Sequence, residues 1–166
     1  MYSQISNGDI LSILVSKNSS TLEKLISFWE GFPVFHSCIS FWQGNELFVF
    51  QMDPNGYCVV PISHYIYNDI HVLKKPKNVK FDILEQFYNV SQYNYSFIGA
   101  FKAGISQYLP GLFKSRAIKK KFCSQYCIDV WKAGGFIYNN SDIIDPAMLE
   151  RQLLNRGIQM IVIKGE

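Results

Sequence analysis

Short apolar runs separated by turn residues fill the first half of the chain. Runs rich in Val, Ile and Phe predict β-strands where Gly, Pro, Asn or Asp residues bound them. Two of the gaps, at residues 43–45 and 53–56, are short enough to close antiparallel hairpins. The strands predicted in this half cover residues 10–15, 34–42, 46–51, 57–60 and 69–73, with one helical turn at residues 61–65.

Apolar residues in the second half recur at intervals of three and four, which is the spacing of one helix face. The segment 122–133 shows this pattern most clearly, and Gly134 with Gly135 ends it. Asp145 followed by Pro146 is typical of a helix start, because proline fits the first helical position. The helices predicted in the whole chain cover residues 22–29, 81–90, 97–109, 122–133 and 146–155, and residues 158–163 predict a closing strand.

This order of elements, with a β-meander first and most helices after it, predicts the α+β class. The 166 residues are enough to bury the core of one domain, which we expect to span residues 1–166. Hydrophobic residues make up 48% of the chain and charged residues 17%, a balance opposite to that of disordered proteins. We therefore expect an antiparallel sheet packed against helices.

Charge and hydropathy narrow the range of partners. The net charge of +3 is too small to predict binding to nucleic acid. No apolar run approaches the roughly 20 residues of a membrane span, and the first residues lack the basic and apolar parts of a signal peptide. We therefore expect cytoplasmic synthesis without a signal peptide and no membrane span. The basic run at residues 114–121 predicts a solvated segment, with an anion-binding patch as the alternative.

The spacing of the cysteines indicates whether they could hold a metal. The four cysteines include no Cys-x-x-Cys pair, and their spacing does not match a zinc site. We therefore expect no metal and no cofactor. Cys38 and Cys58 lie in strand-like runs, which predicts buried free thiols. Cys127 follows Cys123 by one helical turn and is expected to pack against the sheet.

His36 and Cys123 are the residues best placed for chemistry. His36 follows a proline-containing turn and opens a predicted strand, so its ring is expected at a sheet edge. Cys123 falls in the first turn of its predicted helix, where unpaired N–H groups and the helix dipole favour a thiolate. A thiolate beside an imidazolium is the activated nucleophile of papain-type catalysis.

Several loose motifs surround these two residues in a consistent order. They are Gly8-Asp9 before a strand, His36 opening a strand, Gly56 to Pro61 forming a strand that leads to proline, Cys123-Ser124 opening a helix that ends at Gly134, and Pro146 beginning a short helix. In this order the chain resembles the circularly permuted branch of the NlpC-like, papain-fold superfamily, which has bacterial, phage and poxvirus members. The resemblance covers nearly the whole chain.

The resemblance implies a permuted papain-like fold, in which the catalytic His precedes the Cys along the chain. It implies Cys123 as nucleophile, His36 as base and position 51 as the residue that orients the imidazole. The family usually has Glu there, whereas Gln51 offers a carbonyl oxygen without a full charge. Asp53, two residues further on, is an alternative orienter. The candidate substrate-binding residues are Ser124 and Tyr126, and Tyr126 also fits the core.

The resemblance also implies a function. It predicts a cysteine peptidase or amidase that cleaves peptidoglycan stem peptides through an acyl-enzyme, encoded by a phage or virus and associated with the virion and its proteins. Two alternatives stay open. One is a thioesterase or acyl transferase acting on lipids. The other is a non-catalytic virion component that retains the fold, which is compatible with Gln51 in place of Glu.

Overall fold

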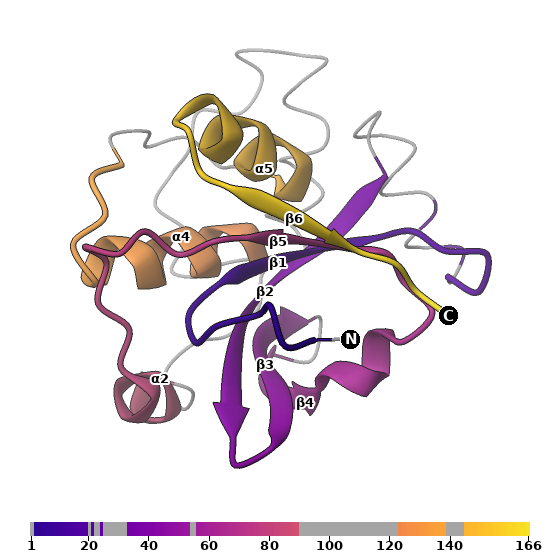
Figure 1. The fold of residues 1–166 in the computed structure, drawn as a ribbon, viewed down its shortest axis with the longest axis horizontal. Helices are drawn as coiled ribbons and strands as arrows, with labels where there is room; N and C mark the ends of the chain where they lie inside the picture. Colours follow the sequence, from indigo (N-terminus) through magenta and orange to yellow (C-terminus); the bar gives the residue numbers. More distant parts are fainter. Residues whose placement is uncertain are drawn as a thin grey trace.

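A six-stranded antiparallel sheet runs through the centre of the computed structural model (Figure 1). The structure describes residues 2–19, 21, 24, 33–53, 56–89, 123–138 and 145–166. The strand order is β4-β3-β2-β1-β5-β6, and every neighbouring pair is antiparallel. The strands are β1 (Ile10–Leu14), β2 (Val34–Gln43), β3 (Glu46–Asp53), β4 (Gly56–Pro61), β5 (Ile70–Leu73) and β6 (Met160–Ile163).

The described α-helices follow β1 to β5 along the chain, and the strand β6 closes it, as the sequence predicts. The described helices are the 3₁₀ helix η1 (Ile62–Tyr65) and the α-helices α2 (Ile83–Asn89), α4 (Cys123–Ala133) and α5 (Pro146–Asn155). The predicted α+β class, with an antiparallel sheet and helices, is therefore confirmed. Apart from residue 24, the predicted helices at residues 22–29 and 97–109 and the basic run at 114–121 lie outside the described residues.

The hairpin between β3 and β4 is tighter than the sequence pattern predicts. The two strands pair as far as Asp53 and Gly56, both of which were expected in the turn. Gly56 has φ of 120°, a backbone conformation that glycine adopts readily. Gly56 therefore allows the pairing of β3 with β4 to continue into residues that the sequence pattern assigns to the turn.

The two faces of the sheet carry separate apolar clusters. Since alternate residues of a strand point to opposite faces, Cys38 and Ile39 of β2 belong to different clusters. Helices α4 and α5 pack on one face, against β1, β2 and β3. That cluster includes Ile39, Phe41, Phe50, Tyr126, Cys127, Trp131, Leu149 and Leu153. The other face is covered by η1 and the N-terminal segment, in a cluster that includes Ile5, Leu11, Cys38, Val49, Ile62 and Tyr65.

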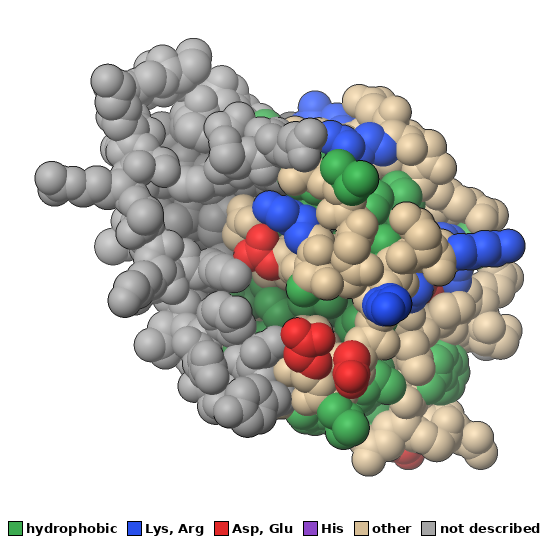
Figure 2. Space-filling view, turned by 90° about the vertical axis from the view of Figure 1, so that its left-hand side faces the viewer, with side chains coloured by type: hydrophobic (Ala, Val, Ile, Leu, Met, Phe, Trp, Pro, Cys, Tyr) green, Lys and Arg blue, Asp and Glu red, His purple; other side chains and the backbone are tan. Residues whose placement is uncertain are grey.

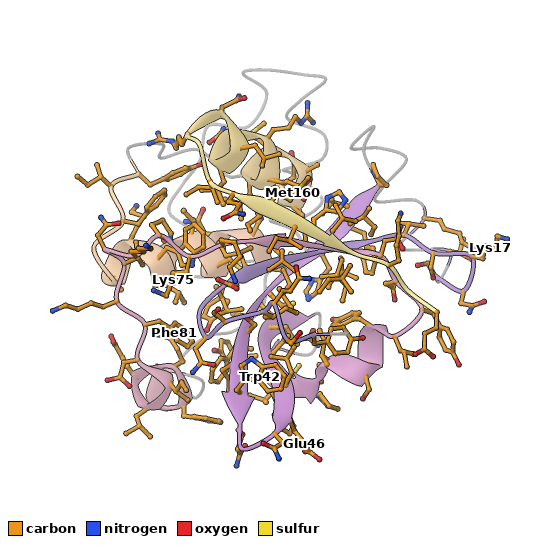
Figure 3. The ribbon with its side chains drawn as sticks, viewed as in Figure 1. Lys17, Trp42, Glu46, Lys75, Phe81 and Met160 are labelled. Atoms are coloured by element: carbon orange, nitrogen blue, oxygen red, sulfur yellow. The ribbon has the colours of Figure 1, made fainter. Side chains whose placement is uncertain are left out.

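The turn before β1 is joined by a hydrogen bond to the C-terminal half of α4. Gly8 has φ of 84°, and a Cβ atom there would lie 2.7 Å from the ring of Phe81 and 2.8 Å from the side chain of Lys75. Figure 3 shows these two side chains close together beside the turn. The Gly8 amide donates to the Ser40 carbonyl at 2.7 Å, and the Trp131 indole donates to the Gly8 carbonyl at 2.8 Å. Trp131 therefore lies at the Ser40 end of β2.

The surface carries mixed charge. On the described part of the face in Figure 2, Lys and Arg side chains lie among Asp and Glu side chains rather than in one patch. None of the helices that the structure describes is long and apolar enough to cross a lipid bilayer.

Candidate active site

His36 occupies an irregular start of β2. It pairs with Ile13, whereas Leu14 pairs with Val34, so Phe35 is an extra residue in the ladder. Such a bulge changes the direction in which neighbouring side chains point, and bulges are frequent beside active sites. The His36 side chain is half-buried, and its ring centroid lies 6.2 Å from that of Tyr65 in η1.

The hairpin formed by β2 and β3 brings His36 and Gln51 together. Nε2 of His36 lies 3.3 Å from Oε1 of Gln51. An amide oxygen can only accept, so Nε2 is the nitrogen that carries the proton in this contact. In the neutral ring, Nδ1 then has the lone pair and is the basic nitrogen.

Two further side chains contact the Gln51 amide. The Tyr65 hydroxyl donates to Oε1 of Gln51, the same oxygen that faces His36. On the other side of the amide, Nε2 of Gln51 donates to Sγ of Cys58 at 3.3 Å. Gln51 is 4% exposed, so these contacts replace hydration by water. No sequence motif indicated Tyr65 or Cys58, because both meet Gln51 through tertiary structure.

Cys123 is the first residue of α4 and so lies in the first turn of the helix, as the sequence predicts. It precedes Trp131 by about two helical turns, or about 12 Å. His36 precedes Ser40 on β2 by a similar distance, about 13 Å. Because α4 packs against β2 and Trp131 lies near Ser40, α4 lies alongside the strand that carries His36.

Electrostatic coupling among the thiols agrees with this position. Burial raises the pKa of the Cys38 thiol well above its usual range, and charge on Cys123 raises it further. Cys38 follows His36 by two residues, and its coupling to Cys123 agrees with the packing of α4 against β2. Burial likewise raises the pKa of Cys127, with further contributions from Cys38 and Cys123. Cys38 and Cys127 are therefore poor nucleophiles.

The other candidate residues are Ser124, Tyr126 and Asp53. Ser124 and Tyr126 are both buried. The Tyr126 hydroxyl bonds to the Tyr57 hydroxyl and donates to Oε1 of Gln86 at 3.1 Å, which fits the core role expected as an alternative. Substrate contact by Ser124 and Tyr126 stays a prediction. Asp53 ends β3, and its side chain lies outside what the structure describes.

A second histidine forms a hydrogen bond that the sequence did not suggest. Nδ1 of His71 on β5 lies 2.9 Å from Oε1 of Glu150 on α5, and Glu150 is 1% exposed. Beside it, Ser12 pairs with both His71 and Ser37 in the sheet. The hydroxyls of Ser12 and Ser37 and Oε2 of Glu150 are buried and have no hydrogen-bond partner among the described residues.

Metal-binding clusters are not found in the described ranges, where no group of three or more His, Cys, Asp and Glu side chains could hold an ion. The four cysteines are free thiols.

Comparisons with known proteins bear on the fold. No protein-family model matches the sequence, and no curated protein matches it significantly. Among solved structures, the chain is similar to that of the metalloprotein YiiX from Escherichia coli O157:H7, a DUF1105 protein. The TM-score is 0.51 at 14% sequence identity, over 98% of each chain. At this identity the similarity concerns the fold alone, and it extends over nearly the full length of both chains.

Proposed function

We propose that this protein is a cysteine peptidase or amidase with a circularly permuted, NlpC-like papain fold. Cys123 is the nucleophile, His36 is the general base, and Gln51 orients the imidazole. The observation that carries the proposal is the contact between His36 Nε2 and Gln51 Oε1, at 3.3 Å, on two strands against which α4 packs. With the proton on Nε2, the lone pair on Nδ1 is able to accept the proton of a thiol.

The first half of the proposed reaction forms an acyl-enzyme. Nδ1 of His36 takes the proton from Sγ of Cys123, and the thiolate attacks the carbonyl carbon of the scissile amide. The tetrahedral oxyanion is stabilised by backbone N–H groups in the first turn of α4, since a helix start leaves such groups without helical partners. The imidazolium then gives its proton to the leaving amine, and the C–N bond breaks.

Hydrolysis of the thioester completes the cycle. His36 takes a proton from water, the hydroxide attacks the acyl carbon, and the proton returns to Sγ as the C–S bond breaks. The products are a carboxylic acid, an amine and the free enzyme. No step requires an oxidant, a reductant or a second substrate besides water.

The substrate class follows from the same resemblance. We propose a peptide or a peptidoglycan stem peptide as substrate, with a phage or virus as source and a virion-associated role beside other virion proteins. The mixed charge on the described part of the face in Figure 2 gives no preference for a polyanion on that face.

The test is hydrolysis of purified muropeptides, followed by mass spectrometry of the products. Wild-type protein should release cleaved peptides and should form a covalent adduct with an acyl probe at Cys123. Cys123→Ala should abolish both, whereas Cys127→Ala, which removes a buried thiol one turn away, should retain both. A wild-type protein that gives neither products nor adduct would refute the proposal.

A second candidate function is a non-catalytic structural role. One observation favours it: Tyr65 and Cys38, the neighbours of His36 and Gln51, belong to the η1 face of the sheet, whereas Cys127 and Tyr126 of α4 pack on the other face. The neutral Gln51 also supports it. Under this alternative, a Cys123→Ala virus or phage should assemble and infect as the wild type does.

A further inference from the structure

The orientation of the Gln51 amide determines which tautomer His36 adopts. A carboxylate accepts through both oxygens, so either of its orientations holds the imidazole N–H. A glutamine amide has one accepting and one donating end. If its NH₂ group faced Nε2 of His36, the imidazole proton would move to Nδ1, and Nδ1 could not accept the thiol proton. A site with Gln therefore needs something that sets the amide orientation.

The structure contains contacts of this kind. The Tyr65 hydroxyl donates to Oε1 of Gln51, and Nε2 of Gln51 donates to the Cys58 sulfur at 3.3 Å. A phenol is a better donor than acceptor, so it favours the orientation in which Oε1 faces both Tyr65 and His36. Tyr65 is 7% exposed and Gln51 is 4% exposed, so water competes little for these groups.

The two contacts come from different elements. Cys58 pairs with Gln51 across the β3–β4 ladder, and Tyr65 belongs to η1, which packs against β3. The ring of Tyr65 also lies 6.2 Å from the imidazole of His36, centroid to centroid. The Gln51 side chain is thus held from two sides while its oxygen faces His36.

We infer that Tyr65 is a positioning residue: through its hydrogen bond to Gln51 it keeps the amide oxygen toward His36 and holds the imidazole in the tautomer protonated at Nε2. Cys58 assists from the other end of the amide. This inference rests on the proposed function for its catalytic meaning, whereas the tautomer is a property of the folded protein. It explains how a neutral Gln can occupy the position where the similar family has Glu.

The direct test measures the tautomer. Nitrogen-15 NMR of the histidine side chains distinguishes a protonated from an unprotonated ring nitrogen. Wild-type His36 should be protonated at Nε2 when neutral. Tyr65→Phe removes only the hydroxyl and should raise the ratio of the Nδ1–H to the Nε2–H tautomer about fivefold, the factor that one hydrogen bond supplies. The matched control is Tyr138→Phe, because the Tyr138 hydroxyl also donates to a Gln side chain, Gln152.

A second test uses rescue. Tyr65→Phe should lower kcat for hydrolysis with little change in KM. Combining it with Gln51→Glu should restore kcat to the value of Gln51→Glu alone, since a carboxylate needs no orientation. A purely structural role for Tyr65 would lower activity by the same factor in both backgrounds.

The results of these tests distinguish the positioning role of Tyr65 from the proposed hydrolase activity. An unchanged tautomer ratio in Tyr65→Phe, or the same loss of kcat in both backgrounds, would overturn the positioning role even in an active enzyme. A shifted ratio in a protein that hydrolyses no peptide would support the positioning role and refute the hydrolase proposal.

Discussion

Cys123 should react with iodoacetamide faster at neutral pH than the other cysteines, and His36→Ala should remove that advantage. The thiolate is the reactive form, so the rate of alkylation reports how much thiolate is present. Cys38 and Cys127 are 0% exposed, and burial raises the pKa of both thiols. We therefore expect neither Cys38 nor Cys127 to compete with Cys123 for the reagent.

The size of the effect follows from the ionisation of a thiol. An ordinary thiol, with a pKa near 8.5, is about 3% thiolate at pH 7. A thiol held as thiolate by an imidazolium is almost fully ionised, so loss of His36 should slow alkylation by up to about thirtyfold. Cys123 is only 7% exposed, which slows alkylation in both proteins alike, and comparing one thiol with itself removes that factor.

The assay is the rate of carbamidomethylation at Cys123, followed by peptide mass spectrometry between about pH 4 and pH 9. Iodoacetamide is supplied in large excess to both proteins, so that the half-exposed Cys58 does not deplete the reagent. Wild type should react well below pH 7, and His36→Ala should need a pH near that of an ordinary thiol. Equal pH midpoints in the two proteins would refute the Cys123–His36 pair.

Three further predictions concern single side chains. Gln51→Glu should extend hydrolysis to higher pH, because a carboxylate stabilises the imidazolium; a pH–rate profile unchanged from wild type would contradict this. Burial raises the pKa of Asp145, the N-cap of α5, so the stability it contributes falls as pH rises above about 4. Urea denaturation at pH 7 should therefore find Asp145→Asn at least as stable as wild type and Asp145→Ala about 1 kcal/mol less stable, and equal losses in the two variants would disprove the argument. Ser12→Ala should stabilise the protein by about 1 kcal/mol, because it removes a buried hydroxyl that has no partner in the described part of the chain. Ser40→Ala should destabilise the protein, since the Ser40 hydroxyl donates to the Ser6 carbonyl at 2.8 Å. Thermal denaturation that ranks the two variants the other way would refute this.

Most of the secondary structure was predictable from short stretches of sequence. The spacing of apolar residues predicted every described strand and helix to within a few residues, and Asp145 with Pro146 marked the start of α5. Such patterns work because the periods of strands and helices depend on neighbouring residues. The tight β3–β4 hairpin was the exception, because the pairing of Asp53 with Gly56 depends on the ladder rather than on residue type.

The candidate site was predictable only in part. The roles given to His36, Gln51 and Cys123 came from resemblance to a family, since no local pattern connects positions 36, 51 and 123. The register of β2 on β3 places Gln51 opposite Cys38 and within reach of His36, and a slip of one residue would turn Gln51 to the other face. The hydrogen bond therefore depends on strand pairing.

Contacts between residues far apart in the sequence were visible only in the tertiary structure. Tyr65 meets Gln51 because η1 folds back on β3, and Trp131 donates to Gly8 across 123 residues. The pair of His71 with Glu150 likewise joins β5 to α5. The sequence by itself determined which segments become strands and helices, through the local period of apolar residues. Which polar atoms meet was decided by the packing of those segments, because a hydrogen bond depends on positions in space that no local pattern encodes.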